Sequence, residues 1–313
     1  ISDIDEAKKI AAQIGYPVIV KASAGGGGRG IRRVDSEAEL ADQLTAAKQE
    51  ALNFFGNDGV YLEKFIVNPR HVEVQVLADS FGNVIHLGER DCSVQRRNQK
   101  VIEEAPCPVM SEKLRAKMGQ AAVKAAKACG YENAGTIEFL LDIHNDFYFM
   151  EMNTRIQVEH PITELVTGID LVKQQILIAQ GEKLSYKQSD IHLTGHAIEC
   201  RINAENPQFN FRPSPGKIEG LNVPGGPGIR IDSAVYQGYV ITPYYDSMSA
   251  KLIVYAGDRD TAIKKMKWAL AEFLVEGVDT NIDFQLSILR DPDFVSAKID
   301  IGFLERKMAY GEL

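Results

Sequence analysis

The stretch Gly135–Asn153 reads GTIEFLLDIHNDFYFMEMN, and it decides the fold of the region around it. Apolar and aromatic residues lie on both sides of His144-Asn145, which predicts an antiparallel hairpin with a two-residue loop. Glu138 and Glu151 are equally far from that loop, so they lie directly opposite each other, with Cβ atoms about 5 Å apart. Asn153 points to the same face, because side chains two residues apart in a strand share a face.

Two glutamates in such a position predict a bound cation. Like charges opposite each other on a largely apolar hairpin are destabilising unless a cation neutralises them. Oxygen ligands of this hardness suit Mg²⁺ or Mn²⁺, which bridge phosphates. Glu138, Glu151 and Asn153 are therefore the predicted metal ligands. The alternative is that a bulge breaks the register and that both glutamates face water.

The residues that follow, Asn153–Pro161, alternate in a way that favours a continued strand. If the chain stays extended, Arg155, Gln157 and Glu159 follow Asn153 on one face. A cation next to a carboxylate is what an anionic substrate and its general base need. A structural ladder of salt bridges is the alternative, and a structural role is expected for His160.

A glycine cluster, GGGGRG over residues 25–30, lies between two expected strands. It matches G-x-G-x-x-G formally, but no helix follows it, as a dinucleotide-binding loop requires. Such a loop has bare N–H groups that can fold over phosphates, and Lys21 beside it can reach one. The alternative is a solvated linker with a surface lysine. A basic stretch, Arg90–Lys100, can line an anion site, or it can form a solvated face.

The remaining pattern predicts an α+β chain whose strands pair in hairpins more than through βαβ crossovers. Helices are expected over residues 2–14, 36–52, 111–129, 170–179, 261–273 and 280–289. Ser36 with Glu39 predicts a capping box at the second of these helices. Strands are expected over residues 18–21, 31–34, 60–66, 72–77, 135–143 and 147–153, and a Pro- and Gly-rich region of antiparallel sheet begins near Gly195.

Composition sets limits on the class of protein. The 313 residues carry a net charge of −8, which argues against a nucleic-acid partner, since such proteins are more often basic. No apolar run has the length of a membrane span, and no targeting segment is recognisable, so a cytoplasmic location is expected. The four cysteines show neither zinc-site nor disulfide spacing and are expected to be reduced thiols.

Several stretches together resemble biotin carboxylase, a family of ATP-grasp enzymes. They are spread over nearly the whole chain in the family's order: Lys21–Gly30, Asn68–Glu73, Glu89–Ser93, Glu151–Pro161, Glu199–Arg201 and Pro243–Ser247. The resemblance implies an ATP-grasp domain, with a mobile lid over residues 1–65 and a core with the metal and bicarbonate site over residues 66–193. The family's C-terminal α+β domain is expected over residues 194–313, and its N-terminal domain is expected to be absent from this chain.

The same resemblance implies roles for individual residues. It agrees with the hairpin on the metal ligands Glu138, Glu151 and Asn153. It implies a bicarbonate cradle of Lys100, Arg155 and Val158, a base for bicarbonate in Glu159 and a residue that stabilises the biotin enolate in Arg201. The implied nucleotide contacts are Lys21, Gly27, Gly28, Glu63, Lys64, Phe65, Ile66, His71, Gln95 and Asn98. At Asn98 many members carry histidine, although asparagine also occurs.

The implied reaction uses ATP, bicarbonate and two Mg²⁺ or Mn²⁺ ions to carboxylate biotin on its carrier protein through carboxyphosphate. Carboxyltransferase subunits and a second copy of the chain are the other implied partners, and no nucleic acid or membrane is expected. The parent enzyme is expected to be an acetyl-CoA carboxylase of fatty acid biosynthesis, with propionyl-CoA or pyruvate carboxylase as alternatives. Two further alternatives are another ATP-grasp ligase such as a carbamoyl-phosphate synthase, and a non-catalytic nucleotide-binding fragment.

Overall fold

The computed structural model describes residues 1, 3–24 and 31–313, and its chain forms two compact units, Ile1–Val67 and Asn68–Leu313. Each unit has its own sheet and its own helices. Residues 25–30, where the phosphate loop is expected, lie outside the described residues.

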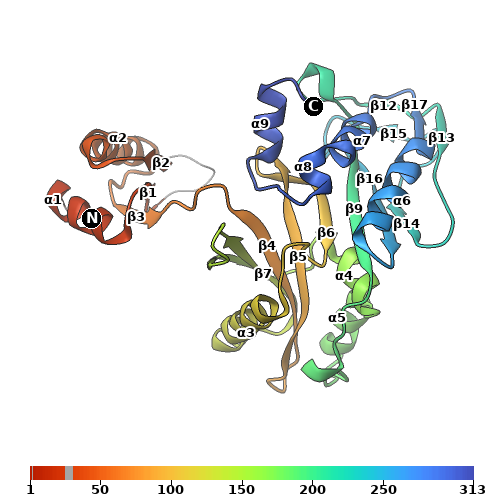
Figure 1. The fold of residues 1–313 in the computed structure, drawn as a ribbon, viewed down its shortest axis with the longest axis horizontal. Coiled ribbons are helices and arrows are strands. Elements are labelled where there is room, and N and C mark those ends of the chain that lie inside the picture. The colour runs from red at the N-terminus through yellow and green to blue at the C-terminus, as the bar shows by residue number, and fades with distance from the viewer. Residues whose placement is uncertain (2, 25–30) are drawn as a thin grey trace. The chain divides into compact units, whose positions relative to one another are not determined.

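The first unit is a three-stranded antiparallel sheet in the order β2-β1-β3, with two helices packed on it (Figure 1). Its elements are α1 (Ile4–Ile14), β1 (Val18–Ala22), β2 (Ile31–Val34), α2 (Glu37–Phe55) and β3 (Val60–Lys64). Strand β1 buries alternate residues, and its inner face meets apolar residues of both helices, among them Ala7, Ala11, Leu40 and Leu44. The helices and strands expected in this unit are thus confirmed to within a few residues.

The start of α2 differs from the prediction. Ser36 occupies the N-cap, but its side chain accepts no hydrogen bond from the helix backbone. The Ser36 hydroxyl donates instead to the Glu39 carboxylate at 3.3 Å, so the predicted capping box is wrong. The helix also continues past Leu52 to Phe55, because the left-handed residue that ends it is Gly56.

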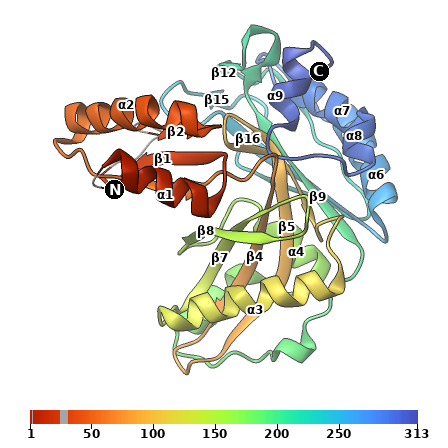
Figure 2. The same cartoon turned by 60° about the vertical axis from the view of Figure 1, so that its left-hand side comes forward.

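The second unit is built on one eight-stranded sheet in which neighbouring strands are antiparallel (Figures 1 and 2). Its order is β14-β16-β9-β6-β5-β4-β7-β8. The strands are β4 (Arg70–Ala78), β5 (Val84–Arg96), β6 (Gln99–Ala105), β7 (Asn133–Leu141), β8 (Phe147–Asn153), β9 (His196–Asn203), β14 (Ile229–Ser233) and β16 (Met248–Ala256). Strand β9 pairs with β6, so the sheet continues through the expected domain boundary near residue 194, which stays a prediction.

Helices cover both faces of this sheet (Figure 2). Helix α3 (Glu112–Ala128) packs Leu114 and Met118 on apolar side chains of β4 and β7. Next in the chain come α4 (His160–Thr167), α5 (Leu171–Ala179), α6 (Arg259–Glu272), α7 (Ile282–Arg290), α8 (Pro292–Val295) and α9 (Phe303–Ala309). Short strands complete the unit: β10 (Glu205–Asn206), β11 (Arg212–Pro213), β12 (Gly216–Lys217), β13 (Gly220–Asn222), β15 (Val240–Ile241) and β17 (Leu274–Glu276).

Some expectations from the sequence differ from the structure of this unit. Strand β4 alternates apolar and polar residues, yet all nine of its residues are buried, including Glu73 and Gln75. The continued strand after Asn153 is wrong: β8 ends there, and α4 begins at His160. Helices α4, α8 and α9 are too short to give a clear period in sequence. No described helix has both the length and the apolar character of a membrane span.

Candidate active site

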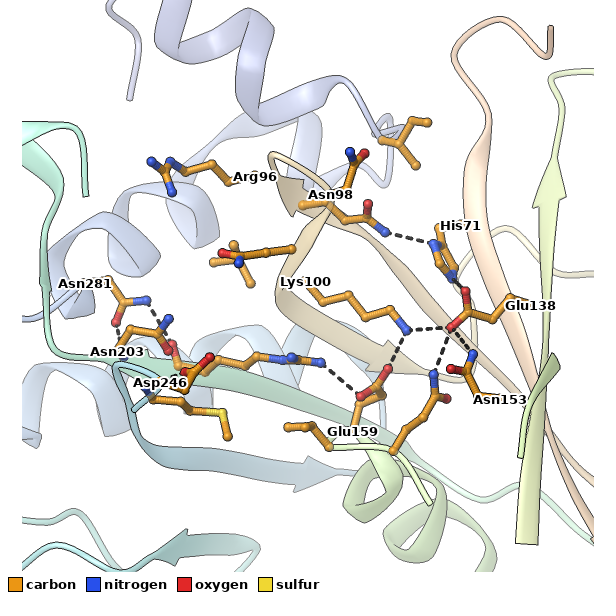
Figure 3. Close-up of a pocket in the computed structure, with 18 of the residues that line it drawn as sticks. His71, Arg96, Asn98, Lys100, Glu138, Asn153, Glu159, Asn203, Asp246 and Asn281 are labelled. Carbon is orange, nitrogen blue, oxygen red and sulfur yellow. Dashed lines mark hydrogen bonds and ion pairs between the residues drawn. The ribbon is translucent and has the colours of Figure 1, made fainter. Parts of the chain in front are cut away.

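A pocket of about 610 Å³ lies within the second unit, at the ends of β4 to β9 (Figure 3). Its wall contains every residue of this unit that the sequence singled out for the site: His71, Gln95, Asn98, Lys100, Glu138, Glu151, Asn153, Arg155, Val158, Glu159 and Arg201. The roles of these residues stay predictions, but the structure brings their side chains to one cavity from strands up to 130 residues apart in sequence, His71 to Arg201.

The β7–β8 hairpin places Glu138 opposite Glu151, as predicted, but its loop and its strand register differ from the prediction. The loop is longer than expected, since Leu141 pairs with Phe147, and Asp142 closes the turn by accepting from the His144 and Asp146 amides. The register then shifts between Glu138 and Phe139, where β8 contributes one extra residue, and this bulge restores the predicted pair. The pairing is therefore confirmed and the two-residue loop is wrong.

Glu138 is the more enclosed of the two glutamates and a centre of polar contacts. It is 4% exposed, whereas Glu151 is exposed. Its Oε1 accepts from Gln157 at 2.8 Å, Asn153 at 2.9 Å and Lys100 at 3.2 Å (Figure 3). Burial works to raise the pKa of Glu138, but the hydrogen bond from His71 and the charge of Lys100 outweigh it and lower the pKa. An ionised carboxylate with a second one opposite and an amide oxygen nearby is a donor set that fits Mg²⁺ or Mn²⁺.

Lys100 connects the two acidic sides of the pocket. Its Nζ lies 3.2 Å from Glu138 and 2.5 Å from Glu159 (Figure 3). It also lies 2.6 Å from Glu73. Burial works to lower the pKa of Lys100, but Glu73 and Glu159 outweigh it and raise the pKa, so the side chain stays an ammonium group. A fixed positive charge therefore lies between the predicted metal ligands and the predicted base.

Glu159 and Arg201 form the other side of the pocket. Glu159 is 2% exposed and is the N-cap residue of α4, and Arg201 extends from β9. The Arg201 guanidinium donates to Glu159 Oε2 at 2.9 Å and, through Nε, to Glu103 Oε1 at 2.6 Å. Glu159 thus contacts two cations, Lys100 through Oε1 and Arg201 through Oε2.

Arg155 is placed differently from the expectation. Because residues 154–159 form a loop, Arg155 does not line up with Glu159 on a strand face. Its side chain is exposed and donates to the Ile156 carbonyl and to Asn153 Oδ1. Gln157 is buried on Glu138 and Arg90 instead, so the expected common face of Arg155, Gln157 and Glu159 is wrong. His160 Nδ1 lies 2.8 Å from the Gln157 carbonyl, in line with the structural role expected for it.

The basic stretch is a hairpin, not a solvated face. Residues 90–95 of β5 are buried, and exposure is confined to the turn at Arg97-Asn98 and to Gln99. Arg90 is fully buried and donates to Glu73 at 2.6 Å and to Gln75 at 2.8 Å. From the sequence, Glu73 received no role and Arg90 was named only within the basic stretch. Charged and polar residues between apolar neighbours in a strand could have indicated that both are buried and paired.

The nucleotide contacts expected in the first unit stay predictions. Lys21 Nζ pairs with the Glu63 carboxylate across β1 and β3. Lys64 donates to the Gly15 carbonyl at 2.8 Å and to the Tyr16 carbonyl at 3.2 Å, and Phe65 lies under the Arg33 guanidinium. Ile66 follows in the segment after β3. Gly27 and Gly28 lie outside the described residues.

Comparison with protein families gives two matches. A family described as carbamoyl-phosphate synthase L chain, ATP binding domain, matches residues 1–187. A second family, the biotin carboxylase C-terminal domain, matches residues 199–306.

Curated relatives match nearly the whole chain. Biotin carboxylase 1 of Bacillus subtilis is 58% identical over 306 residues, covering 97% of this chain and 68% of the relative. The biotin carboxylase of a Nostoc species is 59% identical over 300 residues, covering 96% and 67%. The chain therefore spans about two thirds of the length of these relatives.

Solved structures agree with these matches. The biotin carboxylase domain dimer of Hydrogenobacter thermophilus 2-oxoglutarate carboxylase, in complex with MgADP, ADP and bicarbonate, has a TM-score of 0.87 at 54% identity, covering 98% of this chain and 68% of that one. A biotin carboxylase complex with beta-gamma-ATP from Campylobacter jejuni has a TM-score of 0.88 at 53% identity, covering 97% and 68%. The biotin carboxylase part of a pyruvate carboxylase has a TM-score of 0.86 at 52% identity, covering 99% and 68%.

Proposed function

The chain belongs to the biotin carboxylase family of ATP-dependent ligases, and from this premise we propose that its pocket carboxylates biotin with ATP and bicarbonate. The observation that carries the proposal is Lys100, which lies between Glu138 and Glu159, with Arg201 on the far side of Glu159. The pocket thus combines a carboxylate set for a metal with a separate carboxylate between two cations. An anionic substrate and its base need the second of these arrangements.

In this proposal the chain's own residues divide the reaction into two stages. Lys100, Arg155 and the Val158 backbone bind bicarbonate, and Glu159, next to Lys100, removes its proton. The resulting dianion attacks the γ-phosphoryl group of ATP, giving carboxyphosphate and ADP. Carboxyphosphate then releases CO₂, its phosphate takes the N1 proton of biotin, and Arg201 stabilises the enolate that forms. N1 of the enolate attacks the CO₂, which gives carboxybiotin and leaves phosphate as the other product.

Glu138, Glu151 and Asn153 are the residues that would hold Mg²⁺ or Mn²⁺. When bound, the ions would neutralise the negative charge that develops on the phosphates during phosphoryl transfer. His71, Gln95 and Asn98 line the same pocket and are proposed to contact the nucleotide. Lys21 and the segment Glu63–Ile66 are the nucleotide contacts proposed in the first unit. Gln95 Nε2 lies 2.9 Å from His71 Nδ1, which fixes the imidazole ring next to Glu138.

The partners are part of the proposal. We propose the biotinylated carrier protein as the source of biotin, carboxyltransferase subunits as the consumers of carboxybiotin and a second copy of this chain as a dimer partner, as in the 2-oxoglutarate carboxylase domain dimer. Acetyl-CoA carboxylase is the proposed parent, although relatives named biotin carboxylase and pyruvate carboxylase are almost equally similar. The cytoplasmic location stays a prediction.

A substrate-omission assay tests the proposal. ADP release by the full chain is measured with Mg²⁺, ATP, bicarbonate and free biotin, and each component is omitted in turn. We expect release that requires bicarbonate and rises when biotin is added. ATP hydrolysis that ignores biotin but consumes ammonia would favour a carbamoyl-phosphate synthase, and MgATP binding without any turnover would favour a non-catalytic module.

A further inference from the structure

Another pair of glutamates lies opposite each other in the same sheet, and neither residue lines the pocket. Strands β6 and β9 are antiparallel neighbours, and their register pairs Glu103 with Glu199. Both side chains are 0% exposed. Directly opposed side chains in an antiparallel pair share a face and have Cβ atoms about 5 Å apart, so the two carboxyl groups are within reach of each other.

These carboxyl groups are short of partners. Glu103 Oε1 accepts from Arg201 Nε at 2.6 Å. Within the described residues, however, no hydrogen-bond donor serves Glu103 Oε2 or either oxygen of Glu199. Three buried carboxylate oxygens without a donor would be a costly arrangement if both groups were ionised, because a buried charge needs a compensating partner.

The charged groups around the pair do not remove this cost. Those on the surrounding elements are Arg201 on β9, Lys251 on β16, Lys100 on β6 and Glu159 at the start of α4. Arg201 is already bonded to Glu103 and Glu159. Lys251 donates to the Val158 carbonyl at 2.8 Å and lies 3.4 Å from Asp232, and Lys100 is held by Glu73, Glu138 and Glu159. None of these cations forms an ion pair with Glu199 in the described part of the chain.

We propose that Glu103 and Glu199 hold one proton between them, with neutral Glu199 donating to Glu103 Oε2 and ionised Glu103 orienting Arg201. One proton satisfies the otherwise unpaired Glu103 Oε2 and removes the second buried negative charge. Glu103 keeps its other oxygen for Arg201 Nε, which turns the far end of the guanidinium toward Glu159 and the pocket. Glu199 is then a positioning residue that acts through Glu103 on Arg201.

The direction of the pKa shifts agrees with this arrangement. Burial and the neighbouring Glu103 raise the pKa of Glu199 well above its ordinary value, against the smaller effect of Lys251. Burial also raises the pKa of Glu103, and although Arg201 opposes this, the value reaches about 7. As the pH rises, the first proton therefore leaves Glu103, which faces the cation, and the second stays on Glu199.

This inference rests on the proposed function only for its effect on the reaction; the protonation state itself is measured independently. The full chain and its Glu199→Gln variant are compared by infrared difference spectroscopy at mildly alkaline pH. Glutamine has nearly the same shape, so the variant is expected to fold. We expect the C=O stretch of a protonated carboxylic acid in the wild-type spectrum, lost in Glu199→Gln and kept in Glu103→Gln. A wild-type spectrum in which no such band depends on Glu199 would overturn the proposal, whatever the activity.

Kinetics then separate positioning from simple loss of structure. Glu199→Leu removes the donor to Glu103, and we expect biotin-dependent ADP release to fall about tenfold, because a small misplacement of a substrate-facing group is enough for such a loss. Biotin-independent ATP hydrolysis should change far less. Glu199→Gln supplies an N–H donor in place of the acid proton and should restore most of the biotin-dependent rate. Equal losses in the Leu and Gln variants would show that an ionised Glu199 is required, and the proposal would be wrong.

Discussion

The sheet of the second unit pairs glutamates across strands at Glu138–Glu151 and at Glu103–Glu199, and the surroundings of these two pairs differ. The first pair lines the pocket, and Lys100, Asn153 and Gln157 donate to Glu138. The second pair is fully buried outside the pocket lining, and among the described residues a single cation, Arg201, contacts one of its four oxygens. Glutamates paired across strands therefore suit two kinds of chemistry. Glu138–Glu151, called the open pair because it lines the pocket, is suited to a metal ion, and Glu103–Glu199, called the closed pair because it is buried, is suited to a proton.

Neutralising the open pair should have the largest effect. We expect Glu138→Gln and Glu151→Gln each to reduce Mg²⁺-dependent ATP turnover about a thousandfold, because each removes a charge that positions the metal for phosphoryl transfer. Melting temperature should change little. Glu132→Gln, on an exposed carboxylate just before β7, is the matched control and should be near normal. Near-normal turnover of either variant at low Mg²⁺ would show that the pair does not share a metal.

Substitutions of Arg201 and Glu159, which lie between the two pairs, should separate the two proposed stages of the reaction. Arg201→Ala is expected to lower biotin carboxylation about a hundredfold and bicarbonate-dependent ATP hydrolysis much less, since its role comes after carboxyphosphate. Glu159→Gln should lower both rates about a hundredfold, a usual contribution of a general base. Both rates are followed by ADP release and by ¹⁴C-bicarbonate fixation. Parallel losses for the two variants in both assays would contradict this division.

The closed pair should be visible in the pH dependence of stability. The pKa of Glu103 is raised in the folded chain to about 7, so the folded state binds its proton more tightly than the unfolded state. Stability from this group is fully present below its unfolded pKa and is lost as pH rises toward about 7. Urea unfolding of wild type and Glu103→Gln across this range should show the wild type losing about 3 kcal/mol relative to the variant. A constant difference between the two proteins would mean that Glu103 has an ordinary pKa in the fold.

The smallest effect is expected from a cation next to the closed pair. Lys251 donates to the Val158 carbonyl at 2.8 Å and so fixes the loop that leads to Glu159. Lys251→Met should raise the KM for bicarbonate about threefold, the equivalent of ~0.7 kcal/mol for one lost hydrogen bond. Lys217→Met, on an exposed lysine of β12, is the control. An unchanged KM would show that the loop keeps its position without Lys251.

Local sequence patterns were enough to predict most elements and the position of Glu151 opposite Glu138. Sequence patterns predicted β1, β2, β8 and most helices to within a few residues. In β1 and most helices the pattern follows from one buried and one more exposed face. The Glu138–Glu151 pair was predicted correctly although two local details were wrong, since the longer turn and the bulge cancel. The family resemblance added residues such as Arg201, for which no local pattern exists.

Only the tertiary structure decided which charges meet. Lys100 and Glu159 are 59 residues apart in sequence, and Arg201 and Glu103 are 98 apart, so no local periodicity relates them. The buried character of Glu73, Arg90, Glu103 and Glu199 likewise depends on helices that cover both faces of the sheet, and an alternating strand in sequence looks the same with one face covered or two. By itself the sequence determined the elements, the family and the open glutamate pair. Long-range strand pairing decided the position of the cations and the existence of the closed pair, because these follow from the order of strands rather than from any one of them.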